Sequence, residues 1–348
     1  MRDRRVSRRA FVRSTALTAA ALPILAQAQR QASDRSDLFR HGVASGDPLP
    51  DRVILWTRVT PPPTRSADGP IQVRWTLAHD ERLTRVVTSA TTEAAPGRDF
   101  TVKVDVAGLE PGRTYFYAFD AGGQQSTVGR TRTLPATATS IRIASVSCSN
   151  YAAGFFNVYR CVSRRDDLDA VLHLGDYIYE AAAGEYGDGT AIDRVPRPRT
   201  EAITLAEYRS LYATYRSDID LQAAHRQHPF ITVWDDHEVA NSSWSGGAGA
   251  HSAAEGTWPS RRAAAWRAYR EWMPIRESAG EKVRLYRGFR LGTLADLVML
   301  DTRTFRARQA AADDARALGN PGRSMLGATQ ESWFLDTMRA SGRAGLDF

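Results

Sequence analysis

The chain has 348 residues, of which 43% are hydrophobic and 24% are charged, a balance typical of a soluble globular protein of about two domains. Its formal net charge of +7 suggests nucleic-acid binding, but six Arg and one Asp among residues 1–28 supply +5 of it. The +2 that remains on the rest of the chain is too small to indicate a polyanion-binding protein, so we expect no stable complex with nucleic acid.

Residues 1–28 have the pattern of a twin-arginine export signal. Arg8 and Arg9 precede a short apolar stretch at 16–26, and the small residues at 26–28 have the spacing that signal peptidase accepts. The apolar stretch contains a proline and is shorter than the ~20 residues that a membrane-spanning helix needs. We therefore expect cleavage, no transmembrane anchor in the mature form, the twin-arginine export machinery as a partner, and a periplasmic or secreted location.

Residues 37–135 have the pattern of a small all-β domain. Short alternating runs, of which 53–56, 73–77 and 101–106 are examples, are separated by Pro, Gly and Asp turns. The turn at 108–112 leads to a tyrosine at the start of a strand, as in the tyrosine corner of immunoglobulin-like folds. These features favour a fibronectin-III-like β-sandwich whose aromatic side chains form the core.

After a short linker the hydrophobic period changes, and residues 140–348 have the pattern of an α/β domain with a mostly buried sheet. We expect strands at 141–146, 170–174, 230–234 and 294–300 and helices around 155–165, 204–216, 259–273 and 329–340. Two long glycine-rich loops, at 181–193 and 242–256, are of the kind that borders functional sites.

Side chains suited to metal binding and catalysis follow each predicted strand of this domain. They are Cys148 after the first strand, Asp176 and Tyr179 after the second, Asp235, Asp236, His237 and Asn241 after the third, and Asp301 and Arg303 after the fourth. Ligands of open α/β sheets bind at the carboxyl ends of strands, so we expect these side chains to meet at one edge. Four carboxylates and a histidine there would repel each other without a cation, which predicts a metal site.

Each of these groups also has an ordinary structural explanation when it is considered alone. Cys148 could be a small buried residue, or it could form a disulfide with Cys161, the other cysteine, in an oxidising compartment. The acidic residues at 235–238 could stabilise the start of a helix. Their combination at one sheet edge favours the metal site and a chemical role for Cys148.

The donor atoms indicate which ions such a site would bind. The Cys148 thiolate and the Tyr179 phenolate suit a trivalent ion such as Fe³⁺, and the two oxygens of Asp176 can bridge two ions. The hard oxygen donors after the third strand are those of Asp235, Asp236 and Asn241. These match Ca²⁺, Mg²⁺ or Mn²⁺. For the site as a whole we expect Fe³⁺ and Ca²⁺, with Mg²⁺, Mn²⁺ or Zn²⁺ as alternatives.

A metal cluster of this kind lowers the pKa of a bound water and holds a phosphoryl group for in-line attack, which favours hydrolysis of a phosphoester substrate by a metal-activated hydroxide. In this interpretation His237 stabilises or protonates the leaving oxygen and Arg303 binds a phosphate oxygen. The rate should then be highest at alkaline pH if hydroxide formation limits it.

Five motifs together resemble the alkaline phosphatase D family of the calcineurin-like metallophosphoesterase superfamily. In chain order they lie at 41–48, 147–149, 175–180, 234–239 and 300–303. The resemblance implies twin-arginine export, a β-sandwich before a metallophosphoesterase-like α/β domain, and cleavage of phosphomonoesters and phosphodiesters with Fe³⁺ and Ca²⁺.

Transferred by motif, the family's iron ligands fall on Cys148, Asp176 and Tyr179. Its calcium ligands fall on Asp235 and Asp236, with Asn241 as the amide ligand. Serine follows Asn241 where the family often has a second asparagine. The family also has a late Gly-Asp-x-His motif that this sequence lacks, so we expect the α/β domain to be incomplete at its C-terminus and the metal centre to lack ligands.

Two other functions remain open at this point. In the first, the protein is a secreted module whose β-sandwich binds a polymer or a partner while an incomplete phosphoesterase half is inactive. In the second, it is a nucleic-acid enzyme, which needs a basic groove that a net charge near +2 does not indicate. Metal content, colour and turnover of a chromogenic phosphodiester separate the enzyme from the binding module.

Overall fold

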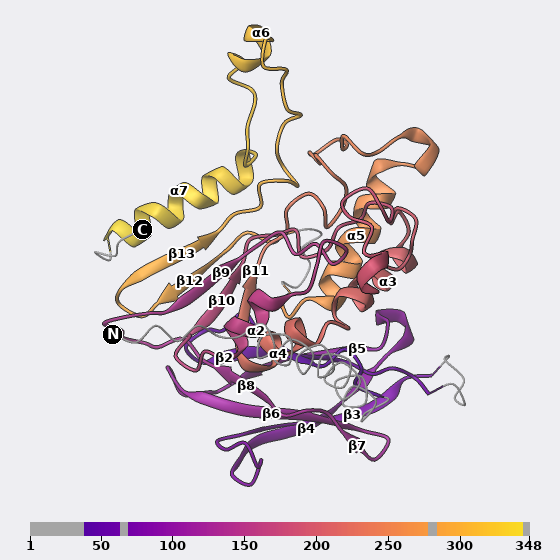
Figure 1. Ribbon diagram of the computed structural model, residues 1–348. Coiled ribbons are helices and arrows are strands. Elements are labelled where there is room, and N and C mark those ends of the chain that lie inside the picture. Colours follow the sequence, from indigo (N-terminus) through magenta and orange to yellow (C-terminus); the bar gives the residue numbers. More distant parts are fainter. Residues whose placement is uncertain (1–37, 63–68, 278–283, 344–348) are drawn as a thin grey trace, which may run out of the picture.

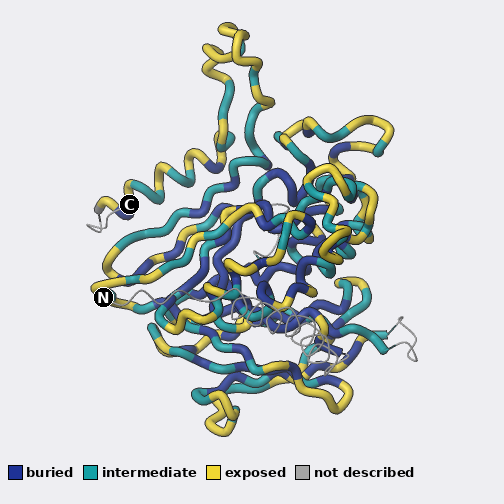
Figure 2. Tube along the Cα trace, viewed as in Figure 1, coloured by how far each residue is buried: buried dark blue, intermediate teal, exposed yellow. Residues whose placement is uncertain are grey.

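The computed structural model describes residues 38–62, 69–277 and 284–343, and the predicted export signal at 1–28 lies outside them. In the described part, two β-sheets face each other at one end of the molecule and helices lie over the larger sheet (Figure 1). Figure 2 shows that the most deeply buried segments lie between these layers.

The smaller layer is a five-stranded antiparallel sheet at the bottom of Figure 1. Its order is β4-β3-β6-β7 with β8 paired to β6, and its strands are β3 Ile71–Ala78, β4 Val86–Ala94, β6 Thr114–Ala121, β7 Gln124–Gln125 and β8 Gly129–Arg132. Val73, Trp75 and Leu77 of β3 are buried, while the residues between them are exposed or half-buried. The alternation predicted for this strand is therefore present.

The larger layer is a six-stranded mixed sheet in the order β5-β2-β1-β11-β10-β9. Its strands are β1 Val43–Gly46, β2 Arg52–Arg58, β5 Thr101–Ala107, β9 Ile143–Val146, β10 Ala170–His173 and β11 Pro229–Thr232. The last three are parallel to one another, and β1 runs parallel to β11. One sheet thus continues from the N-terminal β-rich part into the α/β part, which the sequence pattern did not indicate.

The N-terminal part is a sandwich because β1, β2 and β5 face the smaller sheet. Val53 and Leu55 of β2 belong to the same buried cluster as Val73 of β3. The predicted corner is also present, since the Tyr115 hydroxyl accepts a hydrogen bond from the Glu110 backbone N–H at 2.9 Å. That contact ties the start of β6 to the turn before it.

The fourth predicted strand of the α/β part has a different place from the expected one. It forms β13, Ala295–Met299, which pairs antiparallel with β12, Arg287–Leu291, in a separate two-stranded sheet. In the described range it does not pair with the larger sheet, so the expectation that all four strands share one sheet edge is wrong for β13. The turn at Gly292, with φ of +62°, gives β13 a partner close in sequence, and a short hairpin loop has a small closure entropy.

The β9 edge of the larger sheet is less buried than the sequence predicts. β9 is half-buried to exposed along its length, whereas every residue of β11 is buried. The large apolar side chains of Phe155, Val158 and Leu174 near β9 are 59%, 65% and 48% exposed. The expectation of a mostly buried sheet therefore holds for its centre and not for its β9 edge.

The motif at 41–48 joins the two parts of the fold. A Cβ on Gly46 would lie 2.2 Å from a backbone oxygen, so only glycine fits there. The fully buried Asp47 carboxylate accepts hydrogen bonds from the Arg276 backbone N–H (2.7 Å) and from Nε and Nη2 of Arg287 (3.0 and 2.6 Å). The motif therefore fixes the end of β1 to the segment that leads into β12.

Four of the helices in the described ranges correspond to the predicted ones, and α4 and α6 are additional. They are α2 Asn157–Ser163, α3 Leu205–Tyr215, α4 Ile219–Gln227, α5 Trp258–Trp272, α6 Ala315–Leu318 and α7 Ala328–Arg343, with 3-10 turns at Pro96–Arg98, Thr190–Ile192 and Ala253–Glu255. α3 begins with a capping box, in which Thr204 and Glu207 exchange side-chain to backbone hydrogen bonds. None of the helices in the described ranges is long and apolar enough to cross a bilayer.

Candidate metal centre

The turns after β9 and β10 are joined by main-chain hydrogen bonds. The Cys148 N–H donates to the Gly175 carbonyl (3.1 Å), and the Ser149 N–H donates to the Asp176 carbonyl (2.8 Å). Cys148 and Asp176 both adopt left-handed backbone conformations, with φ of +58° and +52°. Such conformations are uncommon outside glycine and mark constrained positions. As a result, Cys148 Sγ lies 3.6 Å from Asp176 Oδ2.

Gly175 allows the turn after β11 to pack against the turn after β10. Its φ is +108°, and a Cβ at this position would lie 2.4 Å from the Asp235 backbone nitrogen. No side chain can occupy that gap. The close approach brings Asp235 and Asp236 beside Asp176.

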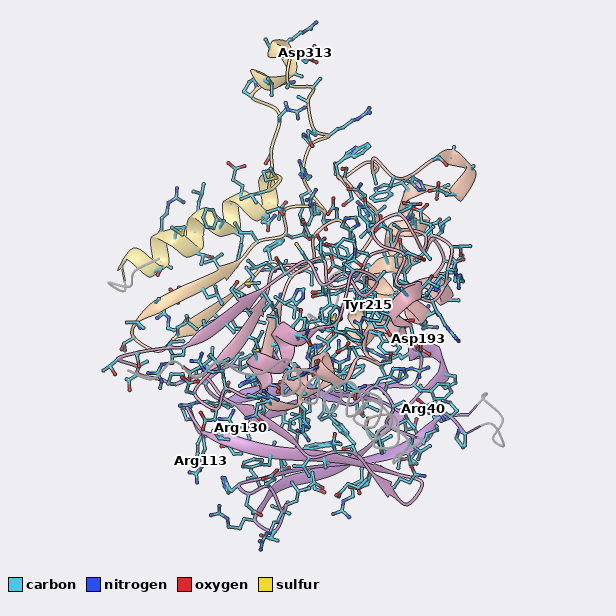
Figure 3. The ribbon with its side chains drawn as sticks, viewed as in Figure 1. Arg40, Arg113, Arg130, Asp193, Tyr215 and Asp313 are labelled. Carbon is cyan, nitrogen blue, oxygen red and sulfur yellow. The ribbon has the colours of Figure 1, made fainter. Side chains whose placement is uncertain are left out.

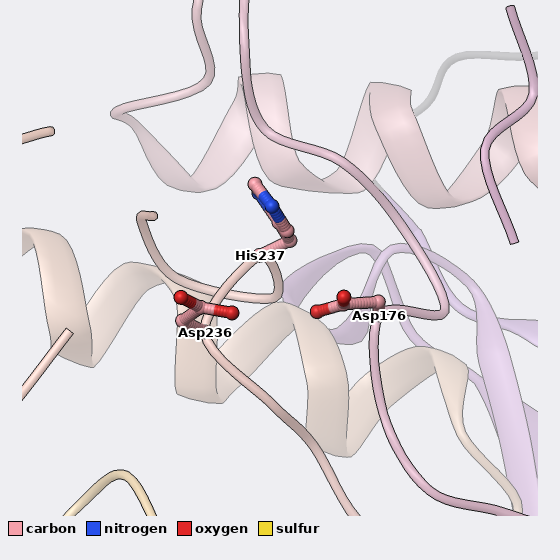
Figure 4. A group of neighbouring side chains, drawn as sticks. All are labelled: Asp176, Asp236 and His237. Atoms are coloured by element: carbon pink, nitrogen blue, oxygen red, sulfur yellow. The ribbon is translucent and has the colours of Figure 1, made fainter. Parts of the chain in front are cut away.

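Three side chains form the centre of the site (Figure 4). Ligand atoms of Asp176, Asp236 and His237 lie within 4.8 Å of one another. The Tyr179 hydroxyl lies 3.4 Å from Asp176 Oδ2, the same oxygen that Cys148 approaches. Carboxylate, imidazole, phenol and thiol groups from the turns after three parallel strands thus meet at one place.

This arrangement is electrostatically unfavourable without a cation. Asp176 is buried, and in the described part of the chain its Oδ1 atom has no hydrogen-bond partner. Burial raises the pKa of Asp176; His237 opposes the rise, and the charges of Asp235 and Asp236 add to it. Burial also raises the pKa of Tyr179, and the Asp176 charge adds to that rise. A cation here would counter each of these effects, so the donor set fits a metal ion.

Glu180 orients His237, and sequence reasoning did not assign it a role. Its buried carboxylate accepts hydrogen bonds from His237 Nδ1 (2.7 Å) and from the Asn241 backbone N–H (2.5 Å). Burial alone would lower the pKa of His237, but the Glu180 hydrogen bond and the nearby negative charges raise it overall. Because Nδ1 is bonded to Glu180, Nε2 is the nitrogen available to the site. The only sequence signal for Glu180 is its place in the motif that contains Asp176.

Glu238 holds the turns after β10 and β11 together. Its fully buried carboxylate accepts the backbone N–H groups of Asp176 (3.1 Å), Tyr177 (2.6 Å) and Asp235 (2.8 Å). Burial raises the pKa of Glu238 to about 8 and the Asp176 charge adds to the rise, whereas the backbone donors favour the ionised form. A cation beside Asp176 would remove part of this repulsion and leave Glu238 ionised, with all three donors satisfied.

Arg303 pairs with the two aspartates that follow β11. Its Nε and Nη2 atoms donate to the Asp235 carboxylate, and its Nη1 atom lies 3.4 Å from Asp236 Oδ2. The buried Asp301 carboxylate accepts the backbone N–H groups of Arg303 (3.0 Å) and Thr304 (2.8 Å), which fixes this turn. The structure therefore places Asp236 within the central group and Asp235 beside it, with both oxygens of Asp235 bonded to Arg303.

Asn241 lies at the rim of the site, where the two long loops meet. Its Oδ1 atom accepts from Ser242 Oγ (3.2 Å), and its Nδ2 atom donates to the Tyr186 hydroxyl (2.9 Å). The Ser242 backbone N–H donates to Asp236 Oδ2 at 2.6 Å. The two loops predicted to border a functional site, 181–193 and 242–256, therefore both reach the site. Tyr186 of the first loop is bonded to Asn241, and Ser242 of the second is bonded to Asp236.

Cys148 and Cys161 are free and exposed thiols, so the disulfide considered from the sequence is not formed. Cys148 also lines a cleft of about 410 Å³, whose walls are built by residues 145–150, 153–156, 158 and 159. The sulfur next to Asp176 is therefore open to solvent on this side.

The fold and the cluster define a protein of an N-terminal β part and an α/β part, with a candidate metal centre at the carboxyl ends of parallel strands. This chain belongs to the PhoD-like phosphatase family. The family model matches residues 143–344, and the model of the family's N-terminal domain matches residues 25–135.

Two related proteins support this assignment. Alkaline phosphatase D of Bacillus subtilis (strain 168) is 40% identical over 319 residues, which cover 87% of this chain and 54% of that protein. The solved structure of PhoD matches with a TM-score of 0.76 and 38% identity, over 86% of this chain and 60% of that one. The resemblance inferred from the five motifs is confirmed, and the chain spans about half the length of the curated relative.

Proposed function

We propose that this protein is an extracytoplasmic, metal-dependent phosphoesterase that hydrolyses phosphomonoesters and phosphodiesters. The observation that carries the proposal is the meeting of Asp176, Asp236 and His237 with Cys148 and Tyr179 at one point of a PhoD-like fold. Export by the twin-arginine machinery, to the periplasm or the exterior, rests on the sequence pattern of residues 1–28. A fibronectin-III-like assignment of the β-sandwich rests on its strand order and on the Tyr115 corner.

The residues that would hold the ions differ in donor type. Cys148, Asp176 and Tyr179 offer the anionic donors that suit Fe³⁺. Asp236, with Asp235 and Asn241 near it, offers oxygens that suit Ca²⁺. When bound, such ions supply an activated hydroxide and neutralise the charge on the phosphoryl oxygens. Both oxygens of Asp235 are bonded to Arg303. Asp235 can therefore bind a cation only if this ion pair opens, or if the cation and Arg303 share the carboxylate.

The chain's own groups would then handle the leaving oxygen and the phosphate. His237 presents Nε2 to the site, because Glu180 holds Nδ1, and a protonated Nε2 can donate to the leaving oxygen. Arg303 places a permanent positive charge beside Asp235 and Asp236, where a phosphate oxygen would sit. The apolar interior behind these turns, with Tyr177 and Ile178 fully buried, keeps water away from that side.

Metal removal and return give the direct test of this function. We expect the purified protein to contain iron and calcium, to show a visible thiolate or phenolate charge-transfer band, and to hydrolyse bis(4-nitrophenyl) phosphate. Dialysis against a chelator should abolish both the band and the turnover, and iron with calcium should restore them. A colourless, metal-free and inactive protein after reconstitution would instead support the secreted binding module.

Replacing Glu180 by Gln tests whether it orients His237. We expect kcat to fall by roughly 10- to 100-fold, as is typical when the partner of a metal-site side chain is lost, with iron content and KM nearly unchanged. Because the Glu180 interaction raises the pKa of His237, its loss should also move the alkaline limb of the kcat profile to lower pH. An unchanged pH profile would show that Glu180 acts only on folding. Glu185→Gln, in an exposed part of the neighbouring loop, is the matched control.

A further inference from the structure

A projecting arm, residues 307–327, connects the turn at Arg303 to α7. Its tip carries α6, and Asp313 lies there (Figure 3). At its base the outgoing and returning segments are joined, because the Ala307 N–H donates to the Ser324 carbonyl at 2.8 Å. Arg323 Nη2 also donates to the Arg308 carbonyl, which reinforces this pairing.

The base of the arm is continuous with the metal centre. The Ser245 N–H donates to the Arg306 carbonyl at 3.1 Å, and Ser245 belongs to the same loop as Ser242, which donates to Asp236. Arg303, three residues before Arg306, is bonded to Asp235. The arm base and the candidate metal centre therefore share one wall.

Arg306 differs from the arginines around it in having no partner for its side chain. Within the described ranges, its guanidinium has no hydrogen bond or ion pair, although the residue is half-buried. Arg303 is satisfied by Asp235, and Arg308 lies over the Trp244 ring at 5.2 Å. The pairing of Ala307 with Ser324 also brings the neighbouring residues Arg306 and Arg323 together. Burial and the Arg303 charge lower the pKa of Arg306, Asp235 and Asp236 oppose that change, and Arg323 adds to it.

A half-buried guanidinium beside other cations is unfavourable unless an anion joins it. The acidic pair Asp235 and Asp236 partly offsets the charge, but Arg303 already occupies that pair. Guanidinium groups bind phosphate and carboxylate through two parallel hydrogen bonds, and they do so best where water is partly excluded. An anionic group bound to Arg306 would lie next to the metal centre but outside it.

We propose that Arg306, with Arg323 beside it, forms a second anion subsite for a negatively charged group of the substrate other than the phosphoryl group being hydrolysed. This inference rests on the proposed phosphoesterase function. It narrows the substrate class to phosphoesters that carry a second phosphate or carboxylate near the scissile bond, and it disfavours esters with a cationic arm.

Three phosphodiesters with the same 4-nitrophenyl leaving group test this subsite. Their second ester arms end in a carboxylate, a methyl group or a trimethylammonium group. We expect kcat/KM to fall in that order for the metal-loaded protein. Arg306→Gln should reduce the preference for the carboxylate over the methyl ester by roughly tenfold, mainly through KM, and Arg323→Gln should reduce it less.

Arg316→Gln, at the arm tip in α6, removes the same charge away from the centre and should leave the preference unchanged. An unchanged preference in Arg306→Gln would overturn the subsite. If no ester is hydrolysed, the phosphoesterase proposal fails, and a second measurement then decides the subsite by itself. Calorimetric titration of the metal-free protein with methylenediphosphonate should give a Kd that rises several-fold in Arg306→Gln. Equal binding by both proteins would refute the subsite.

Discussion

Asp176→Asn is expected to lower phosphoesterase activity by roughly a thousandfold or more, equivalent to about 4 kcal/mol of transition-state stabilisation. Asp176 is the side chain that Cys148, Tyr179, Asp236 and His237 surround, so its charge contributes to every proposed metal contact. Asn retains the size of the side chain and tolerates the left-handed φ of +52°. Kinetics with metal analysis of the same samples measures the effect.

The same substitution should stabilise the metal-free protein. The pKa of Asp176 is raised by burial and by Asp235 and Asp236, so its ionised form is disfavoured in the fold at neutral and alkaline pH. Removal of this charge should raise the urea midpoint at pH 8 in the presence of a chelator and abolish the stabilisation by added metal. Asp188→Asn, on an exposed part of the neighbouring loop, should change neither property. Full activity and metal content in Asp176→Asn would contradict the assignment of the centre.

Asp47→Ala is expected to have the largest effect on stability, a loss of about 3–5 kcal/mol in the free energy of unfolding. The fully buried carboxylate is the acceptor for Arg287 and for the Arg276 backbone, so its removal leaves a charge and an N–H without a partner. Ala also disfavours the left-handed φ of +43° at this position. Urea unfolding followed by tryptophan fluorescence measures the loss.

Two further variants separate the causes of this loss. Asp47→Asn tolerates the backbone conformation but removes the charge, so it should destabilise less than Asp47→Ala. Asp336→Ala breaks the exposed pair with Arg339 on α7 and should cost less than about 1 kcal/mol. If Asp47→Ala and Asp336→Ala have equal effects, the 41–48 motif does not hold the sheet to the β12 segment.

Local sequence patterns were sufficient where structure depends on neighbours along the chain. The alternation in β3, the Tyr115 corner and the capping box of Thr204 and Glu207 depend on residues within a few positions. The turns that carry Cys148, Asp176 and Asp236 were also predictable, because a parallel sheet brings the carboxyl ends of its strands together. The sequence did not predict that β1 pairs with β11, since nothing local marks a partner 184 residues away, as Pro229 is from Ser45.

The roles of the charged side chains around the site needed the tertiary structure. From the sequence, Asp235 and Asp236 were equivalent ligands. In the structure, the turn fixed by Asp301 bonds Arg303 to both oxygens of Asp235, while Asp236, which Arg303 approaches at 3.4 Å, belongs to the group with Asp176. Glu180 and Glu238 were unassigned acidic residues of motifs, and their roles arise from burial and from the donors that surround them. Burial and hydrogen bonding set the charge state of a carboxylate, and neither can be read from its neighbours in the chain.

The amino-acid sequence by itself determined the order of the β and α/β parts, the five motifs and the residue types that reach the end of the parallel strands. These are consequences of hydrophobic period and of strand direction, which each short segment carries independently. Only the tertiary structure decided that one sheet spans both parts and that β13 pairs with β12 rather than with the larger sheet. It also decided that the Arg303 guanidinium is bonded to Asp235, whereas in the described part of the chain the Arg306 guanidinium has no partner. Those outcomes depend on which of several competing partners, near or distant in sequence, each segment pairs with, and the folded chain as a whole decides between them.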